Sequence, residues 1–148
     1  SIGIVFWLVL LTIIMYRLFF HEPLPARMTP MLFILLAPPS VGFVSYTGLV
    51  GGLDNFARVI YYIALFLGLL LALNMFRFIK VPFYISSWAY SFPLAALTIA
   101  SMKIFHFTAS PFFQFISILL LCLLTVLLVW LVVRTVKSIF GAELCRPE

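Results

Sequence analysis

The sequence predicts an all-α integral membrane protein, and three observations carry that prediction: composition, long apolar runs and the placement of prolines. The chain has 148 residues, of which 66% are hydrophobic and only 9% are charged. Soluble domains average about 25% charged residues, so this chain lacks the polar residues that a water-exposed surface needs. Five apolar runs approach or exceed the roughly 20 residues with which a helix crosses a bilayer.

These runs are expected to be five transmembrane helices in a single domain. Gly51 and the glycine after it end the second span, and Asp54 or Asn55 is expected to cap the third helix. Pro82 falls near the first turn of the fourth span, where proline is tolerated, and Pro111 opens the fifth. The predicted spans are residues 2–20, 31–50, 56–78, 81–103 and 111–140.

Prolines separate the five spans into two kinds. Pro38 and Pro39 lie inside the second span and Pro93 inside the fourth, whereas the other three have no internal proline. Proline removes one backbone donor and clashes with the carbonyl four residues earlier. In lipid such a break is costly unless protein shields it or it lines a watery cavity. The pattern therefore predicts an inner layer of two broken helices and an outer layer of three whole ones.

The two broken spans are also rich in small residues, which let membrane helices approach closely or leave room for a pore. The first, third and fifth spans are instead crowded with Leu, Ile, Val and Phe. The candidate pore-lining or kink residues are Pro38, Pro39, Ser40, Gly42, Ser45, Ala89, Pro93 and Ala96.

The basic residues predict an orientation, because cytoplasmic loops carry an excess of Lys and Arg. One side of the membrane would carry Arg17, Arg27, Arg77, Lys80, Arg134, Lys137 and Arg146. The other would carry Arg58 and Lys103. The C-terminus is therefore expected in the cytoplasm and Ser1 outside. The net charge of +5 is explained by these loops, and no basic patch with interleaved aromatics suggests nucleic-acid binding.

The residues argue against an enzyme, a metal site and a cofactor. Ser40, Ser45 and Ser91 have no histidine or carboxylate partner at matching depth. The two cysteines lack clustered histidines, so they make no metal site. Because no charged residue is expected at mid-membrane, a proton-driven pump is disfavoured. A pore with weak uncharged ligands and basic mouths would favour small anions.

Phe92 stands out because it directly precedes Pro93 among small neighbours in the fourth span. A bulky ring there could plug a narrow lumen. The alternative is that Phe92, one of 17 phenylalanines, packs against a neighbouring helix.

The runs Leu36-Ala37-Pro38-Pro39-Ser40-Val41-Gly42 and Trp88-Ala89-Tyr90-Ser91-Phe92-Pro93-Leu94 resemble the tellurite-resistance/dicarboxylate transporter family. That family includes bacterial TehA and the plant slow-type guard-cell anion channels. The resemblance covers the whole chain, as the C-terminal half of a ten-helix unit. It implies helical hairpins around a central pore, inner helices kinked at prolines, and homotrimers with one pore per subunit. A phenylalanine on the ninth helix, matching Phe92, would occlude the pore.

The resemblance implies an anion channel of the TehA type, gated by Phe92, in the inner membrane of a bacterium. One alternative is a carrier for dicarboxylates, sulfite or tellurite-related oxyanions, and another is a non-transporting membrane anchor subunit. Five inner helices are needed to close such a pore and two are expected here. The chain is therefore expected to be a piece of a longer protein, or to need a missing N-terminal half.

Overall fold

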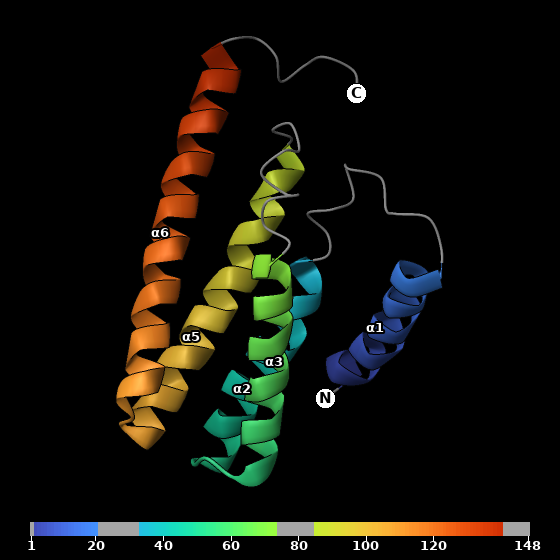
Figure 1. Ribbon diagram of the computed structural model, residues 1–148, viewed down its shortest axis with the longest axis vertical. Coiled ribbons are helices and arrows are strands. Elements are labelled where there is room, and N and C mark those ends of the chain that lie inside the picture. Colours follow the sequence, from blue (N-terminus) through green and yellow to red (C-terminus); the bar gives the residue numbers. More distant parts are fainter. Residues whose placement is uncertain (1, 21–32, 74–84, 141–148) are drawn as a thin grey trace.

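The computed structural model describes residues 2–20, 33–73 and 85–140, and its regular elements are all helical (Figure 1). The all-α class predicted from composition is confirmed. The elements are α1 (Ile2–Phe20), α2 (Ala37–Val50), α3 (Asn55–Leu73), the 3₁₀ helix η2 (Ile85–Tyr90), α5 (Ser91–Thr108) and α6 (Pro111–Phe140). Three spans within the described ranges are long and apolar enough to cross a membrane: Phe33–Val50, Asn55–Leu73 and Pro111–Ile139. The protein is therefore a multi-pass membrane protein.

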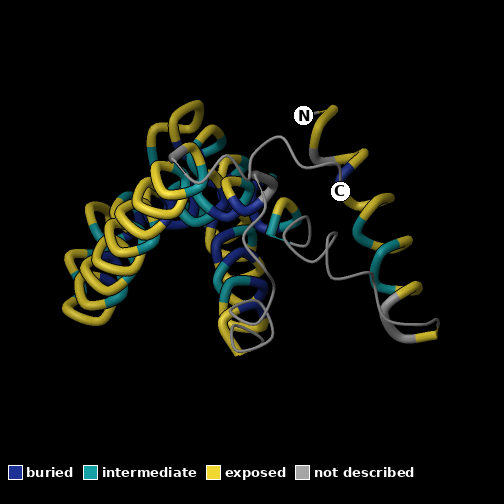
Figure 2. Tube along the Cα trace, turned by 90° about the horizontal axis from the view of Figure 1, so that it is seen from above, coloured by how far each residue is buried: buried dark blue, intermediate teal, exposed yellow. Residues whose placement is uncertain are grey.

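Helices α2 and α5 occupy the centre of the arrangement. Helix α2 packs against α1, α3 and α5, and helix α5 packs against α2, α3 and α6. Viewed from above, the buried positions gather in the middle, while α1 and α6 at the two sides are mostly exposed (Figure 2). The two proline-containing helices thus form a central pair, flanked by the three helices without internal proline.

The prolines mark changes of helix type. Residues 33–36 form a 3₁₀ turn that leads directly into α2, and Pro38 and Pro39 lie in the first turn of that helix. In the same way η2 leads into α5, whose third residue is Pro93. The break expected at each proline is therefore a 3₁₀-to-α transition. A proline is least costly there, because the first turn of an α-helix has donors without intrahelical partners.

The two adjacent prolines leave one carbonyl without a local donor. The oxygen of Leu35 would accept from residue 38 in a 3₁₀ turn or from residue 39 in an α-helix, and both are prolines. The indole of Trp7 supplies the missing bond: its Nε1 donates to the Leu35 oxygen at 3.0 Å. Trp7 itself is buried. One side chain of α1 therefore compensates for the proline pair at the start of α2.

Two apolar clusters hold the helices together. One joins Trp7 to residues of α2, α3 and α5, namely Leu36, Ala64, Leu67, Leu71 and Leu97. The other joins Phe43, Ala57, Tyr61, Ala100, Ile104 and Phe113. Small residues set the approach of α3 to α5, since a Cβ built on Gly68 would lie 2.7 Å from Cδ2 of Leu97.

Hydroxyl side chains inside the bundle are satisfied locally. The buried hydroxyls of Ser40, Thr47 and Ser117 each donate to the carbonyl four residues earlier. This arrangement keeps a serine or threonine inside an apolar helix without an unpaired donor. A hydrogen bond of 3.0 Å joins the buried Tyr61 and Ser101 hydroxyls across α3 and α5. Within the described ranges, every buried side-chain nitrogen and oxygen has a partner.

The connection between α2 and α3 is fixed by caps at both ends. Gly51 adopts a left-handed conformation, with φ of 71°, and its N–H donates to the Thr47 oxygen. Asp54 caps α3: its Oδ1 accepts the Ala57 N–H at 2.8 Å and its Oδ2 accepts the Tyr46 hydroxyl at 2.6 Å. These two bonds, that from Tyr46 first, lower the pKa of the Asp54 carboxyl below its usual value. Of the two predicted caps, Asp54 is therefore the one used.

The fourth predicted span continues farther than expected. Its helix runs to Thr108, past the predicted end at Lys103, because apolar residues continue the helix. Ala109 ends it in a left-handed conformation, with φ of 49° and a 2.7 Å hydrogen bond from its N–H to the Phe105 oxygen. The predicted end of this span at residue 103 therefore falls five residues short of the helix end. Lys103 is a helical residue.

The helix connections and the described basic residues lie at the two ends of the bundle, as the predicted orientation requires. The α2–α3 and α5–α6 connections lie at one end of the bundle and the C-terminal end of α6 at the other (Figure 1). Arg58 and Lys103 are near the first end, and Arg134 and Lys137 near the second. Four further basic residues of the charge count lie outside the described residues: Arg27, Arg77, Lys80 and Arg146. Which end faces the cytoplasm stays a prediction.

Candidate pore-facing surface

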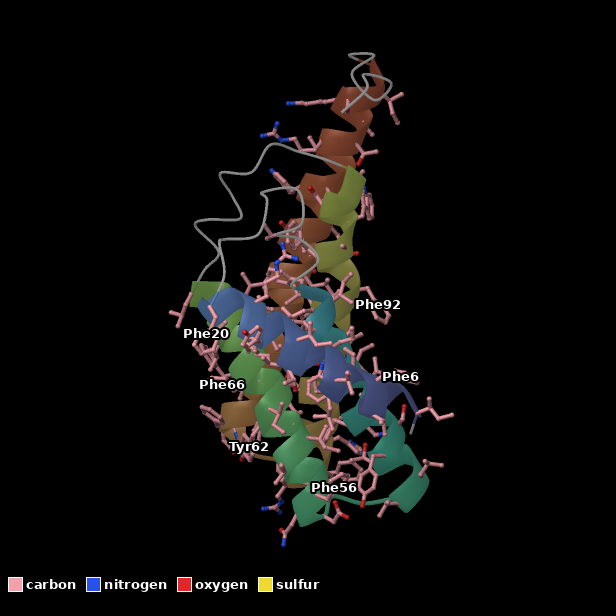
Figure 3. All side chains as sticks on the ribbon, turned by 90° about the vertical axis from the view of Figure 1, so that its right-hand side faces the viewer. Phe6, Phe20, Phe56, Tyr62, Phe66 and Phe92 are labelled. Carbon is pink, nitrogen blue, oxygen red and sulfur yellow. The ribbon has the colours of Figure 1, made fainter. Side chains whose placement is uncertain are left out.

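Phe92 projects from the bundle. Its side chain is 64% exposed, although it lies between the half-buried Ser91 and the buried Pro93. In Figure 3 its ring points to the side of the molecule opposite to Tyr62 and Phe66, which extend from α3. Phe92 therefore lies on the free face of a central helix, away from the aromatic outer face of α3.

One face of α5 is left uncovered by the other helices. At about 100° per residue, Ile99 and His106 lie within about 40° of Phe92 around the helix axis, and both are exposed. The opposite side, represented by Leu97, Ser101 and Ile104, is fully packed. This uncovered strip is interrupted by Ala96, which is buried about 40° from Phe92, and by the half-buried Lys103.

A matching strip runs along α2. Val41, Ser45 and Gly48 are exposed and lie on one face at spacings of four and three residues. Phe43 and Thr47, on the other side, are buried. We call the exposed residues of the two strips the inner face: Val41, Ser45 and Gly48 of α2, with Phe92, Ile99 and His106 of α5.

Lys103 connects the two strips. It is half-buried, and its Nζ donates to the Val44 oxygen of α2 at 2.8 Å. A Cβ built on Gly48 would lie 3.5 Å from the same Nζ, so the ammonium lies against the edge of the α2 strip. Lys103 follows Phe92 by 11 residues, or about three turns and 16 Å, and is rotated from it by only about 20°. A positive charge therefore borders the inner face near one end.

The run around Phe92 is held from both sides. The Trp88 indole donates to Oγ1 of Thr135 on α6 at 3.1 Å. The Tyr90 ring meets the Phe33 ring edge-on, with centroids 4.8 Å apart. The Ser91 hydroxyl donates to the Trp88 oxygen at 2.7 Å. These contacts fix η2 and the start of α5, so the Phe92 ring is presented from an anchored backbone.

The predicted site residues divide by exposure. Phe92 and Ser45 are exposed, and Pro38, Gly42 and Ala89 are half-buried. Pro39, Ser40, Pro93 and Ala96 are buried between the helices of this chain. The structure thus brings the two proline regions to neighbouring central helices. The contact of Lys103 with α2 and the bond between Trp88 and Thr135 join different helices and do not follow from the sequence. The spacing of 11 residues after Phe92 was the available signal for Lys103.

The described residues contain no group of three or more His, Cys, Asp or Glu side chains that could hold a metal ion. His106 is exposed on the inner-face side of α5, and Cys122 is a free, exposed cysteine on α6. His21 and Cys145 lie outside the described residues. Among the described residues, the inner face therefore carries no carboxylate and is bordered by Lys103.

The described residues thus form an all-α membrane protein in which two proline-containing helices, α2 and α5, pack against each other. The chain matches the family described as voltage-dependent anion channel, SLAC1, over residues 1–136. It therefore belongs to that family, and the family recognised from the Trp88–Leu94 run is confirmed. No solved structure matches the chain.

Several curated relatives are similar to the chain. S-type anion channel SLAH3 of Arabidopsis thaliana is 33% identical over 140 residues, which are 95% of this chain and 22% of that protein. S-type anion channel SLAH2 of the same plant is 35% identical over 105 residues, 70% of this chain and 20% of that protein. The uncharacterized transporter MJ0762 of Methanocaldococcus jannaschii is 24% identical over 158 residues, 99% of this chain and 46% of that protein.

The chain spans between about a fifth and a half of the length of these relatives. The relatives named by function are channels, and none of these three is named as an enzyme. Family membership and the membrane fold are thus established for this chain.

Proposed function

We propose that the complete protein containing this chain conducts small anions passively, through a pore walled in part by the inner face. The single observation that carries the proposal is the position of Phe92: an exposed ring on the uncovered face of a central helix, next to a buried proline. The S-type anion channels among the relatives support the choice of anions as the solute. The lack of described carboxylates on the inner face agrees with this charge preference.

In this proposal the Phe92 ring gates the pore by moving between occluding and open rotamers. The backbone around it is held by Trp88 and Tyr90, so the moving part is the side chain. Ser45, the exposed hydroxyl of the inner face, would offer the passing anion a weak donor. Pro39, Ser40, Pro93 and Ala96 act through packing, because they are buried.

The test is Phe92→Ala in the complete protein, with anion current measured in planar bilayers or oocytes. We expect a severalfold or greater increase in chloride or nitrate conductance, because removal of the ring widens the lumen. Phe66→Ala is the matched control: Phe66 is 62% exposed but lies on α3, on the opposite side of the molecule (Figure 3). An unchanged current from well-expressed Phe92→Ala, or an equal increase from Phe66→Ala, would refute the gate.

The same measurements separate the other transport classes. Ohmic single-channel current supports a channel, whereas saturable flux with countertransport of dicarboxylate or sulfite would replace it with a carrier. Absence of any anion flux from purified, folded protein in liposomes would support a non-transporting membrane anchor subunit.

We also propose a homotrimer in a bacterial inner membrane, with the C-terminus in the cytoplasm and this chain as the second half of a ten-helix domain. The clustering of Arg134 and Lys137 near the C-terminal end of α6 supports that orientation. Crosslinking in detergent tests the trimer, and labelling of a single cysteine near the end of α6 from either side of the membrane tests the orientation. A monomer, or labelling from outside only, would contradict these assignments.

A further inference from the structure

Lys103 is the charged residue that borders the inner face, and it has no role in the gating by Phe92 described above. Asp54 is the only carboxylate among the described residues, and its two oxygens are engaged by the Tyr46 hydroxyl and the Ala57 N–H. The ammonium of Lys103 is bonded instead to a backbone carbonyl, which carries no formal charge. Its positive charge therefore contributes to the potential at this end of the inner face.

The position of this ammonium is fixed by geometry. Lys103 leaves α5 on the face that carries Phe92, and its Nζ crosses to α2, where it meets the Val44 oxygen at 2.8 Å. Nζ also lies beside Gly48, since a Cβ built there would be in ordinary contact with it at 3.5 Å. A lysine ammonium has three N–H donors, and the bond to Val44 uses one of them.

A tethered ammonium has the properties that a binding site for a conducted anion needs. It attracts the anion, but it stays partly hydrated at the end of the pathway, so the anion is not held tightly. The inner face deeper along α5 consists of Ile99 and Phe92, which offer no charge. An anion would therefore pause at Lys103 before it meets the apolar stretch and the ring.

We propose that Lys103, held by the Val44 carbonyl beside Gly48, is an anion-binding group at the mouth of the pathway on the α2–α3 and α5–α6 connection side. It concentrates small inorganic anions about three turns from the Phe92 ring. This inference rests on the proposed channel function and adds to it a named, charged entry site.

The effect should depend on ionic strength. Exposed charges act over a Debye length of about 30 Å at 0.01 M salt but only about 3 Å at 1 M. Removal of the charge by Lys103→Met should lower chloride conductance about threefold to tenfold at 0.01 M salt, and change it little at 1 M. Lys103→Arg keeps the charge and should keep most of the low-salt conductance.

Arg58→Gln is the matched control. Arg58 is an exposed basic residue near the same end of the molecule, but it lies on α3 and is not part of the inner face. We expect its low-salt conductance to equal that of the wild type. An equal loss in Arg58→Gln and Lys103→Met would show a diffuse surface potential and would overturn the proposed site.

Because Lys103 also ties α5 to α2, its loss could disturb folding, and a second experiment separates the two effects. Lys103→Cys, in a background with Cys122 and Cys145 replaced by serine, is modified in the assembled channel while current is recorded. The thiol-reactive ethylammonium reagent should restore low-salt conductance, and the ethylsulfonate reagent should lower it further. Failure of both reagents to change the current of a folded, labelled channel would overturn the site.

These arms also separate the inference from the function on which it rests. If wild-type protein carries no anion current, the proposed channel function fails. If wild-type protein conducts and the reagents have no effect, the channel stands and Lys103 is only a structural tie between α2 and α5.

Discussion

The hydrogen bond between Trp7 and Leu35 gives a prediction whose magnitude follows from the structure. Trp7→Phe keeps an aromatic ring in the buried cluster but removes the N–H that reaches the Leu35 oxygen at 3.0 Å. Pro38 and Pro39 prevent any local replacement of that donor. An unsatisfied buried polar group costs about 1–3 kcal/mol, whereas side-chain hydrogen bonds in membrane proteins average about 0.6 kcal/mol in double-mutant cycles. We expect a loss of about 1–2 kcal/mol in the free energy of unfolding.

A double-mutant cycle isolates this contribution. Pro39→Ala returns a backbone N–H four residues after Leu35. This N–H can donate to the Leu35 oxygen in place of the indole. In that background Trp7→Phe should cost about 1 kcal/mol less than in the wild type. The assay is reversible unfolding in mixed micelles, followed by helicity. Equal costs of Trp7→Phe in the two backgrounds would refute the reasoning, because the indole N–H would then not be replacing the donor that proline removes.

Trp130→Phe serves as the control for loss of an indole. Trp130 lies on α6, is exposed, and its ring lies 5.6 Å from the Arg134 guanidinium carbon. Its replacement should cost less than that of Trp7 and should not depend on residue 39.

Two further predictions concern packing and capping. Gly68→Ala should destabilise the bundle by about 1–3 kcal/mol, because its methyl group would meet the buried Leu97 side chain at 2.7 Å. Gly3→Ala, a helical position with nothing within 4 Å, should be neutral or slightly stabilising in the same unfolding assay, and equal effects at the two glycines would refute the close approach. Asp54→Asn should remove the pH dependence that the wild type shows at acidic pH: the folded-state pKa of Asp54 is lowered from 3.8, so its contribution is complete above that value and is lost as pH falls through the lower one. Thermal unfolding between pH 6 and pH 3 measures this difference, and identical pH profiles for the two proteins would contradict it.

The sequence by itself predicted that this is a membrane protein and separated the proline-containing helices from the helices without internal proline. With 9% charged residues the chain cannot cover itself with polar groups, so lipid is the only solvent that suits the apolar runs. Pro38, Pro39 and Pro93 identified the two helices that become the central pair. The Trp88–Leu94 run was specific enough to identify the family, which the match over residues 1–136 confirms.

The tertiary structure decided what the prolines and the lysine contact. A sequence gives the spacing of residues within one helix, but it does not give the depth and rotation of one helix against another. The Trp7–Leu35 bond joins residues 28 apart and the Lys103–Val44 bond joins residues 59 apart, so neither follows from local periodicity. The composition predicted a membrane protein, and the placement of the prolines predicted two broken helices. Helix packing placed the proline breaks at 3₁₀-to-α transitions, presented Phe92 on an uncovered face and set a charge three turns from its ring.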